Sequence, residues 1–373
     1  MALPNSPTRC SPPGMRKFRD TAIGLSIGTL GGLLCWALHI PAPWLAGSMV
    51  FGIAAIFSGV RLGMPDWLKA LSFIFLGIQT GTSVSWETVD RAVHWPLSIA
   101  FLGLTVIAVT WACTAYYVKR SKWDKATALF ASLPGALSLV LLLASGTKAD
   151  MRRVTIAQCI RLFFLVAALP SVIVWLSPPD HVMGGPGVIG SLWEILLVVA
   201  VSTAAGYALE WMKVPAGLML GPMLASAALE LSGHIHGAAP NSVLIPANIV
   251  LGVMIASRFA NFSFGELLQA LKEGFSGFLI ALVIAMAGAG IASWAAGLPF
   301  ALTLLAFSPG GLDAMTIMAF ALDLDPAYVG AHQMARYIGL ALLMPAVTAY
   351  VLRRMGVHGS VTVPGVPSKL DDR

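Results

Sequence analysis

The chain carries two copies of one sequence block, 175 residues apart, within otherwise apolar sequence. Residues 134–170 align without a gap with residues 309–345, and ten of the 37 aligned positions are identical. The identical pairs are spread over the block and include Pro134 and Pro309, Gly135 and Gly310, Asp150 and Asp325, Gln158 and Gln333, and Arg161 and Arg336. A chain duplicated in this way is expected to form two equivalent halves, and its function is expected to use both.

The duplication extends over nearly the whole chain. Shorter matches relate residues 41–49 to 215–223, 58–59 to 232–233, and 76–78 to 251–253. We therefore expect a first membrane repeat over residues 20–180 and a second over residues 181–355. Residues 1–19, which are rich in proline and basic residues, are expected to form a disordered cytoplasmic tail, and residues 356–373 a second cytoplasmic tail.

The composition places these repeats in a membrane. Hydrophobic residues make up 57% of the chain, charged residues 11%, and the mean hydropathy is +0.82, whereas about a quarter of the residues in a soluble domain are charged. Twelve apolar segments approach the roughly 20 residues that cross a bilayer as a helix. The net charge of +6 comes from loops and tails, which indicates a cytoplasmic membrane face rather than nucleic-acid binding.

The distribution of lysine and arginine predicts how these segments cross. If all twelve cross, 14 of these cations fall inside and 7 outside. If the fifth segment of each copy enters and returns to the same side, 20 fall inside and only Arg91 outside, which agrees far better with the positive-inside rule. Five crossings per copy is an odd number, so the copies face opposite ways. The predicted fold is an all-α polytopic membrane protein of two inverted five-helix repeats, with twelve spans as the alternative to ten.

The fifth segment of each copy is interrupted by a Pro-Gly pair, at residues 134–135 and 309–310. Proline removes an amide donor and clashes with the preceding turn, and glycine tolerates non-helical backbone. Irregular backbone survives at membrane depth only where protein or water covers it. Inverted repeats with broken helices are typical of secondary transporters. A kinked helix that crosses completely is the other interpretation.

A polar stripe follows each break on one face of the next predicted helix. The stripe comprises Asp150, Gln158 and Arg161 in the first copy, and Asp325, Gln333 and Arg336 in the second, which adds His332. The two aspartates are expected to be helix N-caps, with Pro326 completing a helix start in the second copy. Each arginine then lies about 16 Å from its helix start, in a hydrocarbon core roughly 30 Å thick.

An arginine at that depth is costly unless it pairs, lines water or holds a substrate. Half-helix N-termini at the breaks add bare amide donors and partial positive charge, so we expect a small polar or anionic solute near both Pro-Gly pairs. The alternative is a structural pairing of each arginine, with Asp313 or with carbonyls freed at a break. Further candidate groups are Ser138, Asp313 and Thr316, and Asp313 and His332 are also candidates for coupling to protons or cations.

The repeated motifs resemble those of the AbrB membrane protein family. Both copies carry Pro-Gly-x-Leu, a later aspartate, Val-x-x-x-Gln-x-x-Arg and a closing proline, and residues 215–223 read Pro-Ala-x-x-x-x-Gly-Pro-Met. The resemblance covers residues from about 20 to 355. It concerns a membrane family, distinct from the small DNA-binding regulator that shares the name. The resemblance implies a tandem duplication, and family members are labelled ammonia monooxygenase or regulator of gene expression.

The residues weigh against the enzyme label. A monooxygenase needs copper or iron held by clustered histidines and carboxylates, whereas the seven histidines fall mostly in separate loops and tails, and the four cysteines are scattered. We expect no enzymatic activity, cofactor, metal or direct contact with nucleic acid. The expected partners are the lipid bilayer and the solute, in a bacterial inner membrane with both termini cytoplasmic. The competing hypothesis is a membrane regulator that binds a ligand without moving it.

Overall fold

A computed structural model describes residues 13–354 except residues 136, 146, 177–190, 215, 236–239 and 323. All regular secondary structure in this part of the chain is helical. The first half contains α1 (Pro13–Ala37), α2 (Pro43–Phe57), α3 (Asp66–Thr82), α4 (Trp86–Arg91), the 3-10 helix η1 (Ala92–His94), α5 (Trp95–Lys119), α6 (Lys125–Ser132), α7 (Leu137–Ser145) and α8 (Met151–Leu176). The second half contains α9 (Leu192–Trp211), α10 (Gly217–Leu231), α11 (Asn241–Ser257), α12 (Phe264–Ala296), α13 (Phe300–Phe307), α14 (Leu312–Ala321) and α15 (Pro326–Arg354).

The fold class predicted from the sequence is confirmed. Five of the described helices are long and apolar enough to cross a bilayer, namely α1 from Phe18, α5, α8, α9 and α12, and shorter apolar helices stand beside them. Helix α1 begins at Pro13, within the segment expected to be a disordered tail. The tail predicted for residues 356–373 lies outside the described residues.

The two halves repeat the same order of helices and the same contacts. Helix α1 packs on α2 as α9 packs on α10, α5 packs on α6 as α12 packs on α13, and α6 packs on α8 as α13 packs on α15. One difference is that α12 is continuous where the first half has α4, η1 and α5. Pro96 lies in the first turn of α5, where its missing amide donor costs no helical hydrogen bond.

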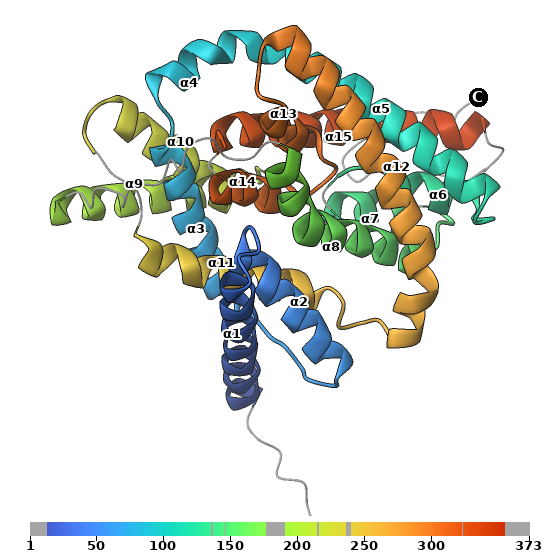
Figure 1. Cartoon of the computed structure of the whole chain (residues 1–373), viewed down its shortest axis with the longest axis horizontal. Coiled ribbons are helices and arrows are strands. Elements are labelled where there is room, and N and C mark those ends of the chain that lie inside the picture. The colour runs from blue at the N-terminus through green and yellow to red at the C-terminus, as the bar shows by residue number, and fades with distance from the viewer. Residues whose placement is uncertain are drawn as a thin grey trace, which may run out of the picture.

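The helices form two groups, each built from both halves. Helices α1, α2, α3, α9, α10 and α11 contact one another and are called here the scaffold group. Helices α5–α8 and α12–α15 contact one another and are called the core group. The main links between the groups are made by α2 with α8 and by α3 with α14 and α15. In Figure 1, α1 extends downward from the other helices, and the short helices α13 and α14 lie near the middle.

The copies run in opposite directions along an antiparallel helix pair, α5 and α12. Near one end of the pair, Trp123 donates a hydrogen bond from Nε1 to Glu273 (2.9 Å). Helix α8 begins at this end, because Arg152 pairs with Glu266 in the first turn of α12 (2.7 Å). Helix α15 begins at the other end, where its residue Tyr328 stacks edge-on against Trp95 at the start of α5, with the ring centroids 5.9 Å apart.

The broken segments form hairpins that return to the end they came from. The backbone N–H of Asp150, before α8, donates to Thr127 Oγ1 in the first turn of α6 (2.7 Å). The start of α6 and the end of the loop after α7 therefore lie together, which is incompatible with a segment that crosses completely. In the second half, α13 follows closely after α12, at the same end where α15 begins. The basic loops at residues 119–125 and 148–153 are thus neighbours.

This arrangement predicts which loops lie on opposite sides of the membrane. Lys148 and Pro299 are exposed and lie at opposite ends of the α5–α12 pair. In a chain whose four native cysteines are replaced, we expect Lys148→Cys and Pro299→Cys to react with a membrane-impermeant maleimide from opposite faces of the cell membrane. Labelling of both positions from the same face would contradict the opposite directions of the two copies.

Glycines allow close helix packing at equivalent places in the two halves. A Cβ atom added at Gly47 of α2 would lie 2.3 Å from the carbonyl oxygen of Gly31 in α1. A Cβ atom at Gly221 of α10 would lie 2.4 Å from the carbonyl oxygen of Ala205 in α9. Both obstacles are backbone atoms, so a side chain forces the two helices apart. Small residues at helix contacts are the usual means of close approach inside membranes.

Substitution of Gly47 by alanine is expected to destabilise the protein by about 1–3 kcal/mol, the usual cost of overpacking. The matched control is Gly265→Ala in the first turn of α12, where an added Cβ meets no atom within 4 Å. The midpoint of thermal unfolding in detergent should fall for Gly47→Ala and stay level or rise for Gly265→Ala, because alanine is the better helix former. Equal midpoints would show that the α1–α2 contact tolerates a side chain.

Candidate functional site

The site begins with the two helix breaks. Helix α6 ends at Ser132 and α7 begins at Leu137, and the backbone N–H of Gly135 turns back to the carbonyl of Leu133 (3.0 Å). In the second copy, the N–H of Gly310 turns back to the carbonyl of Ser308 (2.8 Å). The last carbonyls of α6 and α13 lack partners within their helices. They are buried in an apolar molecule, where an unpaired carbonyl is costly.

A buried glutamine from the following long helix satisfies these carbonyls in each copy. Gln158 of α8 donates from Nε2 to the carbonyls of Phe130 (3.1 Å) and Leu133 (3.0 Å). Gln333 of α15 donates from Nε2 toward the α13 carbonyls, the closest being that of Ala306 at 3.1 Å. The two glutamines thus donate to equivalent carbonyls in the two copies, which explains why both copies carry a glutamine at this position.

An arginine one turn further along joins each glutamine. Arg161 donates from Nη2 to the carbonyl of Leu133 (3.0 Å) and to Gln158 Oε1. Arg336 donates from Nη1 to the carbonyl of Ser308 (2.7 Å) and from Nη2 to that of Gly310 (2.5 Å) and to Gln333 Oε1. A cation at the C-terminal end of a helix is favourable for the helix dipole. The pairing of the arginines with freed carbonyls, one of the two alternatives from the sequence, is therefore present.

Both arginines have N–H donors that these hydrogen bonds do not use. A guanidinium carries five N–H groups, and the bonds described above use two of them in Arg161 and three in Arg336. Both side chains are buried, with 8% and 7% of their surface exposed. Among the described residues, no aspartate or glutamate forms an ion pair with either guanidinium. The two buried positive charges thus have hydrogen bonds but no counter-charge in this part of the chain.

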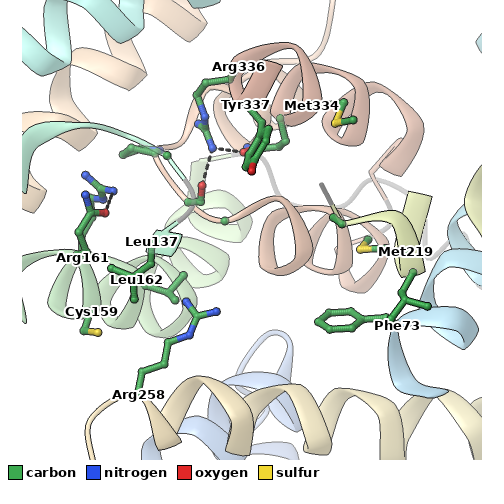
Figure 2. Close-up of a pocket in the computed structure, with 18 of the residues that line it drawn as sticks. Phe73, Leu137, Cys159, Arg161, Leu162, Met219, Arg258, Met334, Arg336 and Tyr337 are labelled. Carbon is green, nitrogen blue, oxygen red and sulfur yellow. Dashed lines mark hydrogen bonds between the residues drawn. The ribbon is translucent and has the colours of Figure 1, made fainter. Parts of the chain in front are cut away.

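Both arginines line one cavity of about 440 Å³ that lies between the scaffold and core groups. The core group contributes the two glutamines, the two arginines and the backbone of both breaks at Gly135 and residues 309–311. The scaffold group contributes Phe73 from α3, Met219 from α10, one residue of α9 and the residue that follows α11. Figure 2 shows Arg161 and Arg336 on separate elements, with Phe73 and Met219 on the facing side.

Two further charged residues line this cavity and were not predicted as site residues. Arg258 follows the last turn of α11 and points toward the cavity in Figure 2. Glu210, in the last turn of α9, is exposed and lies at the rim. The sequence assigned Arg258 to a cytoplasmic loop because of its charge. Neither residue belongs to the duplicated stripe, so the internal repeat could not reveal them.

The predicted helix caps have the expected geometry. Asp150 Oδ1 accepts hydrogen bonds from the backbone N–H groups of Arg152 (3.0 Å) and Arg153 (3.1 Å). Asp325 Oδ1 accepts from the N–H groups of Ala327 (2.9 Å) and Tyr328 (3.2 Å). Both aspartates lie at helix starts and outside the cavity lining. Their position sets the depth of the glutamines and arginines that follow.

The other predicted residues lie apart from the cavity or outside the described atoms. Pro134 is buried and Thr316 of α14 packs toward Gly330 of α15, and neither lines the cavity. His332 is fully buried, with Nε2 2.7 Å from Ser98 Oγ and Nδ1 2.8 Å from the carbonyl of Tyr328. Its role in coupling stays a prediction. The side chains of Ser138 and Asp313 lie outside the part of the chain that the structure describes.

Comparisons with known proteins agree with the motif resemblance. A family model described as "Transition state regulatory protein AbrB" matches residues 3–91 and, in a second match, residues 44–352. The chain belongs to the AbrB family. It is 27% identical over 337 residues to the Escherichia coli (strain K12) protein named "Putative regulator AbrB", covering 88% of this chain and 93% of that protein. It is 25% identical over 355 residues to the Bacillus subtilis (strain 168) protein named "Uncharacterized protein YhjN", covering 86% of this chain and 90% of that protein.

The metal centre that an oxygenase of this family would need can be compared with the structure. Within the described ranges, no three histidine, cysteine, aspartate or glutamate side chains come together in a group that could hold a metal ion. The cavity lining includes Cys159 and Glu210 beside the arginines and glutamines, but these two side chains belong to no such group.

The role of the buried glutamines can be tested by their removal. Gln333→Leu keeps the volume but leaves α13 carbonyls without a donor, and an unsatisfied buried polar group costs about 1–3 kcal/mol. We expect a lower midpoint of thermal unfolding in detergent for this variant. The control Gln269→Leu changes an exposed glutamine of α12 and should leave the midpoint unchanged. An unchanged midpoint for Gln333→Leu would show that the break does not need this donor.

Proposed function

We propose that this protein is a secondary transporter that binds a small anionic solute in the cavity between its scaffold and core groups. The observation that carries the proposal is the pair of buried guanidiniums, Arg161 and Arg336, which line one cavity and have no carboxylate partner among the described residues. The solute would supply the missing negative charge.

The physical argument concerns the cost of buried charge. A buried ion needs a partner, and a charged side chain within a membrane protein is by default a candidate functional group. Each arginine presents unused N–H donors beside the cavity, and Arg258 adds a third guanidinium. Planar guanidiniums suit carboxylate and phosphate oxygens, which they can bind in a bidentate manner. A cavity of about 440 Å³ is within the usual range for a small molecule.

Transport, rather than binding alone, is favoured by the position of the cavity. Its walls come from both helix groups, and each group contains helices from both inverted halves. Inverted repeats allow two related conformations that open a central site to either side. Movement of the core group along the scaffold group would carry the breaks and arginines with the solute. The sparse links between the groups are compatible with such a movement.

We further propose that the basic end of the molecule faces the cytoplasm of a bacterial cell. The loops at residues 119–125 and 148–153 lie together at one end, beside the first turns of α12. Lysine and arginine are enriched in cytoplasmic loops of membrane proteins. Both chain termini are then cytoplasmic, and Glu210 and Arg258 lie on the cytoplasmic side of the cavity.

A binding experiment tests the anion site without disturbing the breaks. The probes are inorganic phosphate, sulfate, acetate, succinate and citrate, each added to the purified protein while thermal unfolding is followed. We expect at least one of them to raise the unfolding midpoint. Arg258→Gln should reduce that increase, because Arg258 lines the cavity but makes no described bond to a break. The control Arg120→Gln removes the same charge outside the cavity. It should leave the anion-induced increase in the unfolding midpoint unchanged.

Flux of the stabilising anion into proteoliposomes then separates transport from sensing. Uptake that Arg258→Gln slows and Arg120→Gln does not would support a transporter. Binding without uptake would instead support a membrane regulator that senses the anion; the Escherichia coli relative is named as a regulator. Absence of stabilisation by every anion in the panel would contradict the anion site itself.

A further inference from the structure

A second, apolar cavity of about 700 Å³ opens on the outer surface of the core group. It lies between α5, α6 and α15 and is called here the α5 groove. Its lining is almost entirely hydrophobic and includes Leu102, Val106, Trp111, Leu129, Ala335 and Leu340. Trp111 and Ile107 on its border are 75% and 67% exposed, so no other described helix covers this face of the core group.

The α5 groove is charged at one end. Lys119 at the end of α5 and Lys125 at the start of α6 both line it, and both are exposed. Among the described residues neither lysine forms an ion pair. They stand at the basic end of the molecule, where α8 also begins. The groove is therefore amphipathic, with two free ammonium groups at the membrane surface and an apolar channel running inward.

The inner wall of the α5 groove is shared with the anion cavity. Leu133 and Arg336 line the groove, and Arg336 also lines the cavity between the helix groups. Leu133 supplies the carbonyl that Gln158 and Arg161 bind. Whatever fills the groove therefore covers the outer side of the first break and the stem of one site arginine.

We propose that the α5 groove binds an anionic phospholipid from the leaflet at the basic end, with its phosphate at Lys119 and Lys125 and an acyl chain along α5 over Leu133 and Arg336. Two unpaired lysines at the membrane surface attract anionic headgroups. Below them, a hydrophobic channel matches a hydrocarbon chain and offers little to a polar ligand. The charge pattern favours a lipid over a second copy of the chain, because a docked helix would leave the two ammonium groups without an anionic partner. The inference does not rest on transport.

Two glycines make the α5 groove easy to block without strain. A Cβ atom added at Gly103 of α5 or at Gly339 of α15 meets no atom of the other described residues within 4 Å, so both positions have open space beside them. Both glycines line the groove. Gly103→Leu and Gly339→Leu should fill the channel while improving helix propensity. Loss of lipid binding in these variants would then reflect the channel rather than unfolding.

The experiment is native mass spectrometry of the purified protein with phosphatidylglycerol and, separately, with phosphatidylcholine of the same acyl chains. We expect preferential retention of phosphatidylglycerol. Lys119→Ala with Lys125→Ala should weaken the binding of phosphatidylglycerol by about 30-fold, since each lysine near an anionic surface contributes about a fivefold to sixfold effect. The control pair Arg120→Ala with Lys148→Ala removes equal charge from the same end but outside the groove and should keep the preference.

The glycine variants distinguish the groove from general surface attraction. Gly103→Leu should lower the retention of both lipids and leave the melting temperature without lipid level or higher. The proposal is overturned if the lysine pair and its control behave alike, or if Gly103→Leu retains lipid as the parent does. It is also overturned if the protein is a dimer that Gly103→Leu dissociates, because the groove would then be a contact between two copies.

Discussion

Backbone carbonyls at a helix break inside an apolar molecule must find donors, and this requirement organises the centre of the protein. The last carbonyls of α6 and α13 have no partners within their own helices. In each copy the donors come from a glutamine and an arginine three residues apart on the next long helix. The break therefore determines where the neighbouring helix packs. The cap aspartate at the start of that helix determines how deep the glutamine and arginine donors lie.

The same requirement explains why the centre of an apolar protein is positively charged. Glutamine alone could satisfy the carbonyls, but arginine brings donors in excess and a charge that the described residues do not neutralise. Arg161 and Arg336 thus stabilise the breaks and face a shared cavity at once. Because that cavity lies between two helix groups, a structural solution to the broken helix also places two guanidiniums beside a space that both groups line. On the outer side, Arg336 borders the α5 groove, so the two cavities meet at one side chain.

Much of this architecture could be predicted from residue patterns. The duplication predicted two equivalent halves, and the count of lysines and arginines predicted that residues 119–125 and 148–153 share one end, which the bond between Asp150 and Thr127 shows. The stripe of glutamine and arginine marked the residues that meet the breaks. The residues that pack against one another in three dimensions could not be predicted from the sequence. Thr316 follows a break in sequence, which predicts a place near the site, yet it packs toward Gly330 of α15, since a helix turns successive side chains to different faces.

The sequence by itself determined the membrane location, the two copies and their opposite orientation, because hydropathy, repetition and charge bias are properties of the chain that do not depend on which helices touch. Only the tertiary structure decided what surrounds the arginines. Arg258 and Glu210 reach the cavity from α11 and α9, far from the stripe in sequence. The division into scaffold and core groups likewise depends on which helices pack together. Such packing results from shape complementarity across distant segments, and close backbone approaches such as that at Gly47 appear only when two helices are brought together.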